Sequence, residues 1–323
     1  METLFSFIRD RLNEDQPVML MTVMEWHGSS PGKTGFKLAV SADGQLTGSI
    51  GGGAMEHRLV ERAKKELKQK QSLKPYLLFQ DHEPDAEENK SGLICSGNQT
   101  ILFYPLNMDH MPVVEQISKT TEQQTKGVLN LTPGKIFFEE GKQLKQKVCS
   151  QIVSEKEWKY QEQTGMPDTI YIFGGGHVGL AVSKLFRMLD FRVIVLDNRN
   201  NLNTFEENHF AHEKHIIHYP EAGQYVPEGF NVYVVIVSFA HKSDEQVLKQ
   251  MLGKNIRYLG MMGSNKKVST IYENLTKEGV NPQLFEQVHS PIGVPINSET
   301  PEEIAVSIAA QIIQVKNNSK TVN

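Results

Sequence analysis

Residues 169–179, TIYIFGGGHVG, combine a run of strand-forming side chains with a cluster of glycines. Gly174, Gly176 and Gly179 fit the pattern G-x-G-x-x-G, in which glycines let the backbone turn tightly and approach a diphosphate. A helix that starts after such a turn offers free N–H groups to an anion. Asp197 ends the next strand-like run and is a candidate acceptor for ribose hydroxyl groups. The pattern predicts a nucleotide-type site, although a tight turn without a ligand has the same sequence.

Other polar residues follow the later apolar runs, at positions where parallel strands would end. Because open α/β sheets bind ligands at the carboxyl ends of their strands, we expect these residues to share one cleft. Ser264 and Lys266 could hold an anion at a helix start, whereas His241 and Asp244 fit either a ligand site or a loop and helix cap. The candidates are His177, Asp197, Asn198, Arg199, Ser238, His241, Asp244, Gly263, Ser264 and Lys266.

Two further stretches rich in glycine or serine lie in the first part of the chain, HGSSPGKTG at 27–35 and GSIGGG at 48–53. Loops of this kind can present successive backbone N–H groups to an anion. Gly51, Gly52 and Gly53 lead directly into a helix-like segment, so they could form an oxyanion or phosphate nest at its N-terminus. Flexible turns are the alternative interpretation, and neither stretch has the spacing of a P-loop.

Cysteine and histidine provide few candidates for metal or sulfur chemistry. Cys95 lies in GLICSGN before a strand-like run, where an exposed thiol could bind a soft metal or carry sulfur; a buried, inert thiol is the alternative. Cys149 lies in a polar stretch without an evident partner. Four further histidines recur every three residues, a spacing that would not keep them all on one face of a helix. They lack an acid or cysteine to complete a familiar ligand set, so the pattern favours a polar crossover over a metal site. These are His209, His212, His215 and His218.

The first part of the chain mixes strand-like and helix-like patterns. Ala42-Asp43-Gly44 separates FKLAVS from QLTGSI, and an Asp-Gly pair in this setting indicates a β-hairpin. The stretch after Gly53 spaces apolar and charged residues as an amphipathic helix does. We therefore expect a smaller α+β or α/β domain over residues 1–140. Its other predicted elements are a helix at 3–13, strands at 18–26 and 99–106, an exposed loop at 81–92 and a hairpin at 127–140.

Residues 141–167 are polar, of mixed charge and without a sustained period, which predicts a linker. From 168 to 317, strand-like and helix-like segments alternate, and this alternation predicts a Rossmann-like, doubly wound parallel sheet. The last helix is well marked, because Thr300 is a candidate N-cap, Pro301 suits the first helical position and Glu303 completes a capping box. A polar tail is expected at 318–323.

Composition and charge exclude several function classes. The 323 residues carry a net charge of -4, so no nucleic-acid-binding surface is expected. No apolar run approaches the roughly 18 residues that a membrane-spanning helix needs. The N-terminus lacks the apolar segment of a signal peptide. Two cysteines without a CxxC pair suit a reducing compartment, so we expect a cytoplasmic protein.

These segments, in this order, resemble the xanthine dehydrogenase accessory protein family. The resemblance covers most of the chain and rests on motifs that ordinary dehydrogenases do not carry together. It implies that a cofactor-handling domain at 1–140 precedes the Rossmann domain, and that the chain is a carrier rather than an enzyme. The motifs are GSSPGKTG, DGQLTGSIGGGAME, CSGN before a strand ending in FYPL, IFGGGHVG, LDNR, SFAHKSD, YLGMMGSNKK and SPIGVPINSETPEEIAVSIAAQI.

The resemblance implies a cargo and partners. Members of this family bind the molybdenum cofactor, a molybdopterin in monophosphate or dinucleotide form. They hold it while a cysteine desulfurase replaces an oxo ligand with sulfur, and they pass it to apo-xanthine dehydrogenase or a related molybdenum hydroxylase. A chaperone that meets a dimeric client is expected to be a homodimer.

The resemblance also implies cofactor-binding residues, position by position. Cys95 would be the contact to molybdenum or to the transferred sulfur. The matching positions in the first domain are Ser29, Ser30, Pro31, Gly51, Gly52, Gly53, Glu56, Cys95 and Gly97, and those in the second are Gly174, Gly176, His177, Gly179, Asp197 and Arg199.

Three positions depart from the family pattern. Ala54 stands where a cysteine is common, which leaves Cys95 as the candidate thiolate. Ser96 replaces a glycine after that cysteine. Gly32 replaces an arginine, so that a phosphate contact is lost or passes to Lys33.

Two alternatives remain open from the residues alone. An NAD(P)-dependent oxidoreductase would use the same glycine turn, with His241 as proton donor. A non-enzymatic regulatory module would only sense NAD(P) or another nucleotide through the Rossmann domain.

Overall fold

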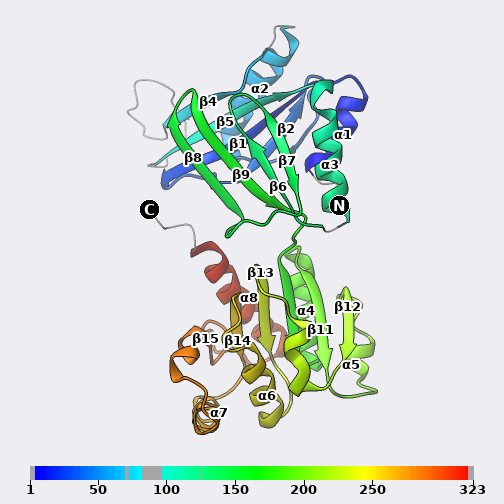
Figure 1. Cartoon of the computed structure of the whole chain (residues 1–323), viewed down its shortest axis with the longest axis vertical. Coiled ribbons are helices and arrows are strands. Elements are labelled where there is room, and N and C mark those ends of the chain that lie inside the picture. The colour runs from blue at the N-terminus through cyan, green and yellow to red at the C-terminus, as the bar shows by residue number, and fades with distance from the viewer. Residues whose placement is uncertain (1–3, 70–72, 82–96, 124, 319–323) are drawn as a thin grey trace. The chain divides into compact units, whose positions relative to one another are not determined.

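The chain divides into two compact units, Met1–Met166 and Pro167–Asn323, and each is described by itself (Figure 1). The structure is a computed structural model. Cys95, Ser96 and all of the predicted loop at 81–92 except Asp81 lie outside the residues it describes. The described residues are 4–69, 73–81, 97–123 and 125–318.

The main sheet of the first unit is antiparallel, and β1 (Val18–Gly28) lies at its centre. The first seven residues of β1 are all buried because both faces of the sheet are covered. Met19 and Met21 pack with the apolar side of α2 (Gly53–Lys68), while Leu20 packs on the opposite side. In spatial order the sheet contains β3 (Leu46–Gly48), β2 (Lys37–Ser41), β1, β5 (Gly97–Leu106) and β4 (Tyr76–Asp81).

A second antiparallel sheet packs on this unit's core, and it overturns the predicted linker at 141–167. These residues form β8 (Val148–Ser154) and β9 (Glu157–Thr164), which pair with each other. The linker prediction is wrong because β8 is an edge strand with polar exposed residues, whereas Trp158 and Tyr160 of β9 are buried in the core. The other elements are β6 (Gly127–Leu131), β7 (Ile136–Glu140), α1 (Leu4–Asn13), the 3-10 turn η1 (Met108–His110) and α3 (Met111–Glu122).

Six parallel strands form the sheet of the second unit, which confirms the predicted Rossmann-like fold. From β10 (Thr169–Phe173) in the middle, the chain adds β11 (Arg192–Asp197) and β12 (Glu213–Ile216) on one side. It then crosses to β13 (Gly229–Ile236) on the other side. The carboxyl ends of β10 and β13 are therefore the topological switch point, where open α/β sheets bind ligands. Beyond β13 lie β14 (Ile256–Met261) and β15 (Val288–His289).

Helices cover both faces of this parallel sheet (Figure 1). On one face lie α4 (His177–Met188) and α8 (Pro301–Asn318), and on the other lie α6 (His241–Met251) and α7 (Asn265–Lys277). None of the helices in the described ranges is long and apolar enough to cross a membrane. Short elements that the sequence analysis did not predict are β12, β15, α5 (Asn203–Glu206) and the 3-10 turns η2 (Tyr219–Tyr225) and η3 (Pro282–Gln287).

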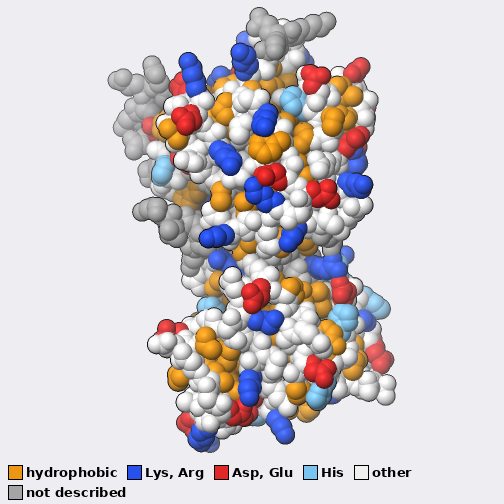
Figure 2. Space-filling view, viewed as in Figure 1, with side chains coloured by type: hydrophobic (Ala, Val, Ile, Leu, Met, Phe, Trp, Pro, Cys, Tyr) orange, Lys and Arg blue, Asp and Glu red, His pale blue; other side chains and the backbone are white. Residues whose placement is uncertain are grey.

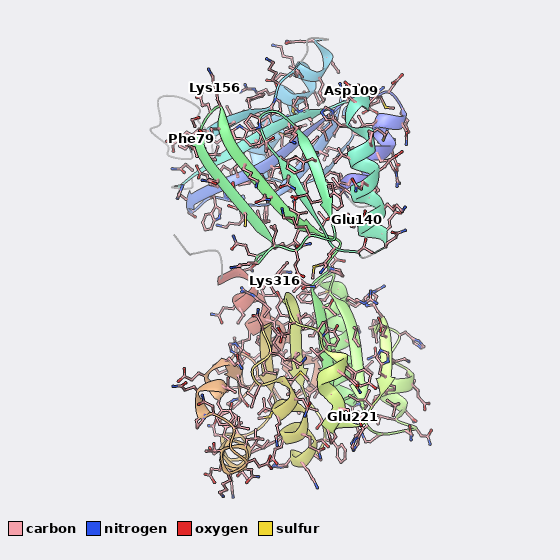
Figure 3. All side chains as sticks on the ribbon, viewed as in Figure 1. Phe79, Asp109, Glu140, Lys156, Glu221 and Lys316 are labelled. Carbon is pink, nitrogen blue, oxygen red and sulfur yellow. The ribbon has the colours of Figure 1, made fainter. Side chains whose placement is uncertain are left out.

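The start of α8 has the predicted capping box. The Thr300 Oγ1 accepts a hydrogen bond of 3.2 Å from the N–H of Glu303, and the Glu303 carboxylate accepts one of 3.1 Å from the N–H of Thr300. Near the other end of α8, Lys316 (labelled in Figure 3) pairs with Asp168 at 2.5 Å. Asn318 ends the helix, and the rest of the predicted tail lies outside the described residues.

Charged side chains of both signs are mixed over the visible face of each unit (Figure 2). Several of them form close pairs, such as Lys142 with Glu139 at 2.8 Å and Lys249 with Glu278 at 2.7 Å. Surface pairs of this kind contribute little stability each. On this face no large region of one sign stands out among the described residues (Figure 2).

Candidate functional site

Three stretches of the first unit meet where β1 and β5 pair at Gly28 and Gly97. The backbone of Gly32 lies so close to Ile50 that a Cβ at Gly32 would be 2.2 Å from the Ile50 carbonyl oxygen. A Cβ at Gly97 would be 2.8 Å from the backbone nitrogen of Ser29. The two predicted loops and the start of β5 are therefore packed together. We call this region the N-terminal site: Ser29, Ser30, Gly32, Gly51, Gly52, Gly53, Glu56 and Gly97.

A buried polar chain connects these stretches. The Ser30 hydroxyl donates to Oε1 of Gln99 at 2.8 Å, and Nε2 of Gln99 donates to the sulfur of Met55 at 3.1 Å. Ser30 is 5% exposed and Gln99 is fully buried. Because buried polar atoms need partners, these contacts fix the loop of Ser30 and the start of α2 relative to β5.

The glycines at the start of α2 form a nest that the chain fills itself. Gly51, Gly52 and Gly53 have φ of 136°, 77° and 70°, in the left-handed region that favours glycine. One carboxylate oxygen of Glu56, Oε2, accepts hydrogen bonds from the N–H groups of Ile50 (2.8 Å) and Gly52 (3.0 Å). It also accepts one of 2.8 Å from the Ser49 hydroxyl. An external anion can use these donors only after Glu56 has moved.

The remaining candidates of the first unit are less connected. Lys33 places its Nζ 3.3 Å from the centroid of the Trp26 ring, so its charge already faces an aromatic partner. Ser29 and Ala54 are exposed, and Pro31 is half-buried. Cys95 precedes Gly97 by two residues and lies outside the described part of the chain.

In the second unit, the predicted glycine turn connects β10 to α4. Gly174 has φ of 124°, and a Cβ there would be 2.5 Å from the carbonyl oxygen of Val237. A Cβ at Gly179 would be 1.9 Å from the carbonyl oxygen of Gly174, so the helix packs directly on the turn. A Cβ at Gly176 would meet no described atom within 4 Å. No described side chain caps α4, so its N-terminus is open at Gly176.

Asp197 does not offer a free carboxylate at the end of β11. It is fully buried, and its Oδ2 accepts hydrogen bonds from the N–H of Gly175 and from Nη2 of Arg199, both at 2.7 Å. Its Oδ1 accepts from the backbone N–H and from Nε of Arg199, both at 2.9 Å. Burial alone would raise the pKa of Asp197, but the hydrogen bonds from Arg199 and Gly175 outweigh burial and lower it. Four donors fill the roughly four lone-pair sites of a carboxylate, which argues against a ribose contact.

Arg199 stacks on an aromatic side chain that the sequence analysis missed. The guanidinium carbon of Arg199 lies 4.6 Å from the centroid of the Phe239 ring, which is 67% exposed. The signal in the sequence is a large aromatic residue three positions after the end of a buried strand, at the edge where ligands bind. We call this region the C-terminal site: Gly174, Gly175, Gly176, Asp197, Arg199 and Phe239.

A buried ion pair lies near the ends of β13 and β14. Asp244 accepts hydrogen bonds from the hydroxyl (2.5 Å) and the N–H (3.2 Å) of Ser238, and it pairs with Lys267. Burial raises the pKa of Asp244, while Lys267 and Ser238 oppose this shift. The predicted anion contact at Lys266 is not part of this cluster: Lys266 is exposed, and the next residue makes the buried contact.

The other predicted residues of this edge have separate roles. Ser264 caps α7 by accepting a hydrogen bond of 3.3 Å from the N–H of Lys267. His177 and His241 are exposed, and Gly263 is half-buried. Within the described ranges, no three His, Cys, Asp or Glu side chains are grouped to hold a metal ion.

Comparisons with known proteins cover both units. Residues 170–312 match the family described as the XdhC Rossmann domain, and residues 11–77 match the XdhC and CoxI family. The chain is 24% identical over 308 residues to the uncharacterized protein YqeB of Escherichia coli (strain K12), with 94% of this chain and 44% of that protein covered. It is 23% identical over 338 residues to a protein of Bacillus subtilis (strain 168) described as a probable xanthine dehydrogenase subunit, with 97% of each covered.

A solved structure shares the fold. A crystal structure described as a xanthine dehydrogenase from Bacillus halodurans matches with a TM-score of 0.68 and 21% identity, over 98% of this chain and 96% of that chain. The chain spans less than half the length of the E. coli relative and nearly all of the B. subtilis one.

Proposed function

Because the chain belongs to the XdhC family, which is related to xanthine dehydrogenase maturation, we propose that it carries the molybdenum cofactor as cargo. In this proposal it binds the cofactor, protects it, presents it for sulfuration by a cysteine desulfurase and delivers it to xanthine dehydrogenase or a related molybdenum hydroxylase. It performs no turnover of its own. We place this role in the cytoplasm and expect a homodimer.

The observation that carries this proposal is the meeting of three sequence stretches in the N-terminal site. The backbone contacts of Gly32 with Ile50 and of Gly97 with Ser29 bring together segments that are up to 68 residues apart. Gly52 is open, because a Cβ there would meet no described atom within 4 Å. Cys95, the candidate thiolate, is only two residues before Gly97 of this site in the sequence.

The donor set suits the anionic phosphate of such a cargo. The N–H groups of Ile50 and Gly52 and the hydroxyl of Ser49 already hold a carboxylate oxygen of Glu56. A phosphate oxygen carries a similar negative charge and accepts the same hydrogen bonds. We propose that Glu56 occupies this nest while the carrier is empty and leaves it when cargo arrives.

The NAD-dependent form of the oxidoreductase alternative receives less support from the second unit. An NAD-dependent enzyme needs a carboxylate at the end of β11 that accepts hydrogen bonds from the ribose diol, whereas an NADP-dependent one can use an arginine there. Asp197 already accepts four hydrogen bonds from Gly175 and Arg199. We therefore propose a carrier rather than an NAD-dependent enzyme.

The proposal is tested by purifying the full chain from cells that make molybdenum cofactor. Molybdenum is measured by mass spectrometry and pterin by fluorescence after oxidation. We expect both to be retained, and Cys95→Ala to lower them more than Cys149→Ala, a matched control in β8. Wild-type protein without pterin, or equal retention by both variants together with turnover of NAD(H), would contradict the proposal.

A further inference from the structure

The C-terminal site offers an arginine to a ligand where Rossmann domains often offer a carboxylate. Acids at the end of the second strand of a Rossmann unit normally bind ribose hydroxyls, and an arginine nearby accommodates a phosphate in their place. Here the acid, Asp197, is fully buried beneath the arginine, Arg199. The edge therefore presents a cation, and not a carboxylate, to a ligand.

Arg199 is held in place and still has donors to offer. Its backbone N–H, Nε and Nη2 all bind Asp197, so the guanidinium has one orientation. Its side chain is 31% exposed, and its Nη1 has no hydrogen-bond partner among the described residues. A preorganised guanidinium with free N–H groups suits a phosphate oxygen.

The same edge contains further unused polar groups. The N-terminus of α4 is open at Gly176, and the first N–H groups of a helix favour an anion. On the face of the sheet that α6 covers, Tyr219 is 1% exposed, and its hydroxyl approaches the backbone of Asn198 and the charges of Asp197 and Arg199. This hydroxyl makes no hydrogen bond of normal geometry to any described residue. A buried polar group without a partner calls for a bound water or ligand atom.

Phe239 provides a flat apolar surface next to these groups. Arg199 covers one face of its ring, and 67% of the side chain is exposed. The glycine turn lies against the residues before Phe239, because a Cβ at Gly174 would be 2.9 Å from the backbone nitrogen of Ser238. An exposed aromatic ring can stack on the flat face of any planar heterocycle.

We propose that the C-terminal site binds a ligand that joins a phosphate monoester to a planar heteroaromatic ring, and that it discriminates against the same ligand with a free ribose diol. Arg199 and the start of α4 hold the phosphate groups, and Phe239 stacks on the ring. Two ligands have these groups: an adenine dinucleotide with a 2′-phosphate, and the pterin cargo with its own phosphate. Only the second ligand rests on the proposed function.

The first experiment measures binding of NADP⁺ and NAD⁺ to the full chain by calorimetry. These probes differ only in the 2′-phosphate. We expect NADP⁺ to bind at least about tenfold more tightly, because charge-assisted hydrogen bonds to Arg199 form only with the phosphate. Equal affinity of both nucleotides would overturn the proposal.

Variants then assign the preference to particular side chains. Arg199→Met should remove the preference for NADP⁺ and raise the affinity for NAD⁺, because Asp197 regains free lone pairs. If Arg199 had a purely structural role, Arg199→Met would weaken the binding of both nucleotides equally. Phe239→Ala changes a side chain that is 67% exposed and should weaken NADP⁺ binding about tenfold through lost stacking. Lys277→Met, an exposed cation in the last turn of α7, is the matched control and should bind like the wild type.

A second arm distinguishes the two ligands. If neither nucleotide binds, pterin retained by wild-type and Arg199→Met protein is compared after purification from cofactor-producing cells. Loss of pterin in Arg199→Met, but not in Lys277→Met, identifies the pterin phosphate as the ligand. If neither nucleotide binds and the variant retains pterin fully, the inference is refuted. If the wild type contains no pterin, the carrier role fails, while the nucleotide titration still decides the inference.

Discussion

The carboxylate of Glu56 accepts a hydrogen bond of 3.0 Å from the backbone N–H of Gly52, four residues earlier in the chain. This contact places a negative charge in the nest at the start of α2, where helix N–H groups and the helix dipole favour an anion. Glu56 is therefore both a stabilising residue of the first unit and a competitor of any anionic ligand.

Glu56→Ala should make the first unit responsive to anions. Removal of the carboxylate leaves three donors without their acceptor. In anion-poor buffer this should reduce the free energy of unfolding by about 1 kcal/mol and lower the melting temperature. Added sulfate should restore stability more in this variant than in the wild type. Glu61→Ala, at an exposed position of the same helix, is the control. Identical sulfate responses of Glu56→Ala and wild-type protein would show that the nest does not bind anions.

Gly32→Ala should destabilise the first unit by about 2 kcal/mol or more, because the new Cβ would lie 2.2 Å from the Ile50 carbonyl oxygen. Gly134→Ala is a matched control in the same unit, since its Cβ would meet no described atom within 4 Å. Both tryptophans belong to this unit, so urea unfolding followed by tryptophan fluorescence reports on it. A Gly32→Ala protein as stable as Gly134→Ala would mean that the two loops are not packed as described.

Asp197→Asn should destabilise the second unit by about 1–3 kcal/mol at neutral pH through loss of charge-assisted hydrogen bonds from Arg199 and Gly175. The folded-state pKa of Asp197 lies below its usual value of 3.8. Its contribution is therefore present above pH 3.8 and is lost as the pH falls through the lower folded pKa. Denaturation followed by circular dichroism should show the gap to the wild type narrowing below about pH 4. If the stability difference between the wild type and Asp197→Asn stayed constant with pH, the ionised carboxylate of Asp197 would not be the source of the stabilisation.

Lys267→Met should cost about 3–5 kcal/mol at pH 7, because it leaves the buried carboxylate of Asp244 without its cation. The pKa of Asp244 is already raised by burial, so its ionisation disfavours folding as the pH rises through that pKa. The defect should therefore shrink as the pH is lowered and Asp244 takes up a proton. Lys266→Met changes the neighbouring exposed lysine and should change stability by no more than about 0.5 kcal/mol. Equal effects of the two substitutions would contradict the buried ion pair.

The fold of the second unit could be predicted because its longer strands are continuous apolar runs and because β10 ends in a glycine turn. Val193, Val195 and Leu196 are buried on both faces of a parallel sheet, and such runs are easily recognised. The hairpin of β8 and β9 was missed because only one of its faces packs on the core. Trp158 and Tyr160, two residues apart, were the available signal for an alternating strand.

The sites were harder to predict than the fold. Glu56, Asp197 and Arg199 were candidates from the sequence, but their partners depend on which backbone N–H groups the fold brings within reach. Asp197 was expected to face a ligand, and the structure shows it beneath Arg199. Lys266 and Lys267 are adjacent in sequence, and only the orientation of α7 decides which of them reaches Asp244.

The chain of contacts from Ser30 through Gln99 to Met55 has a mechanical consequence. Gln99 lies in β5, four residues after Cys95, and its amide nitrogen binds a side chain in the first turn of α2. A rotation of α2 that withdraws Glu56 from the nest must therefore pull on β5 as well. Occupation of the nest by an anion is in this way coupled to the position of Gln99 in β5.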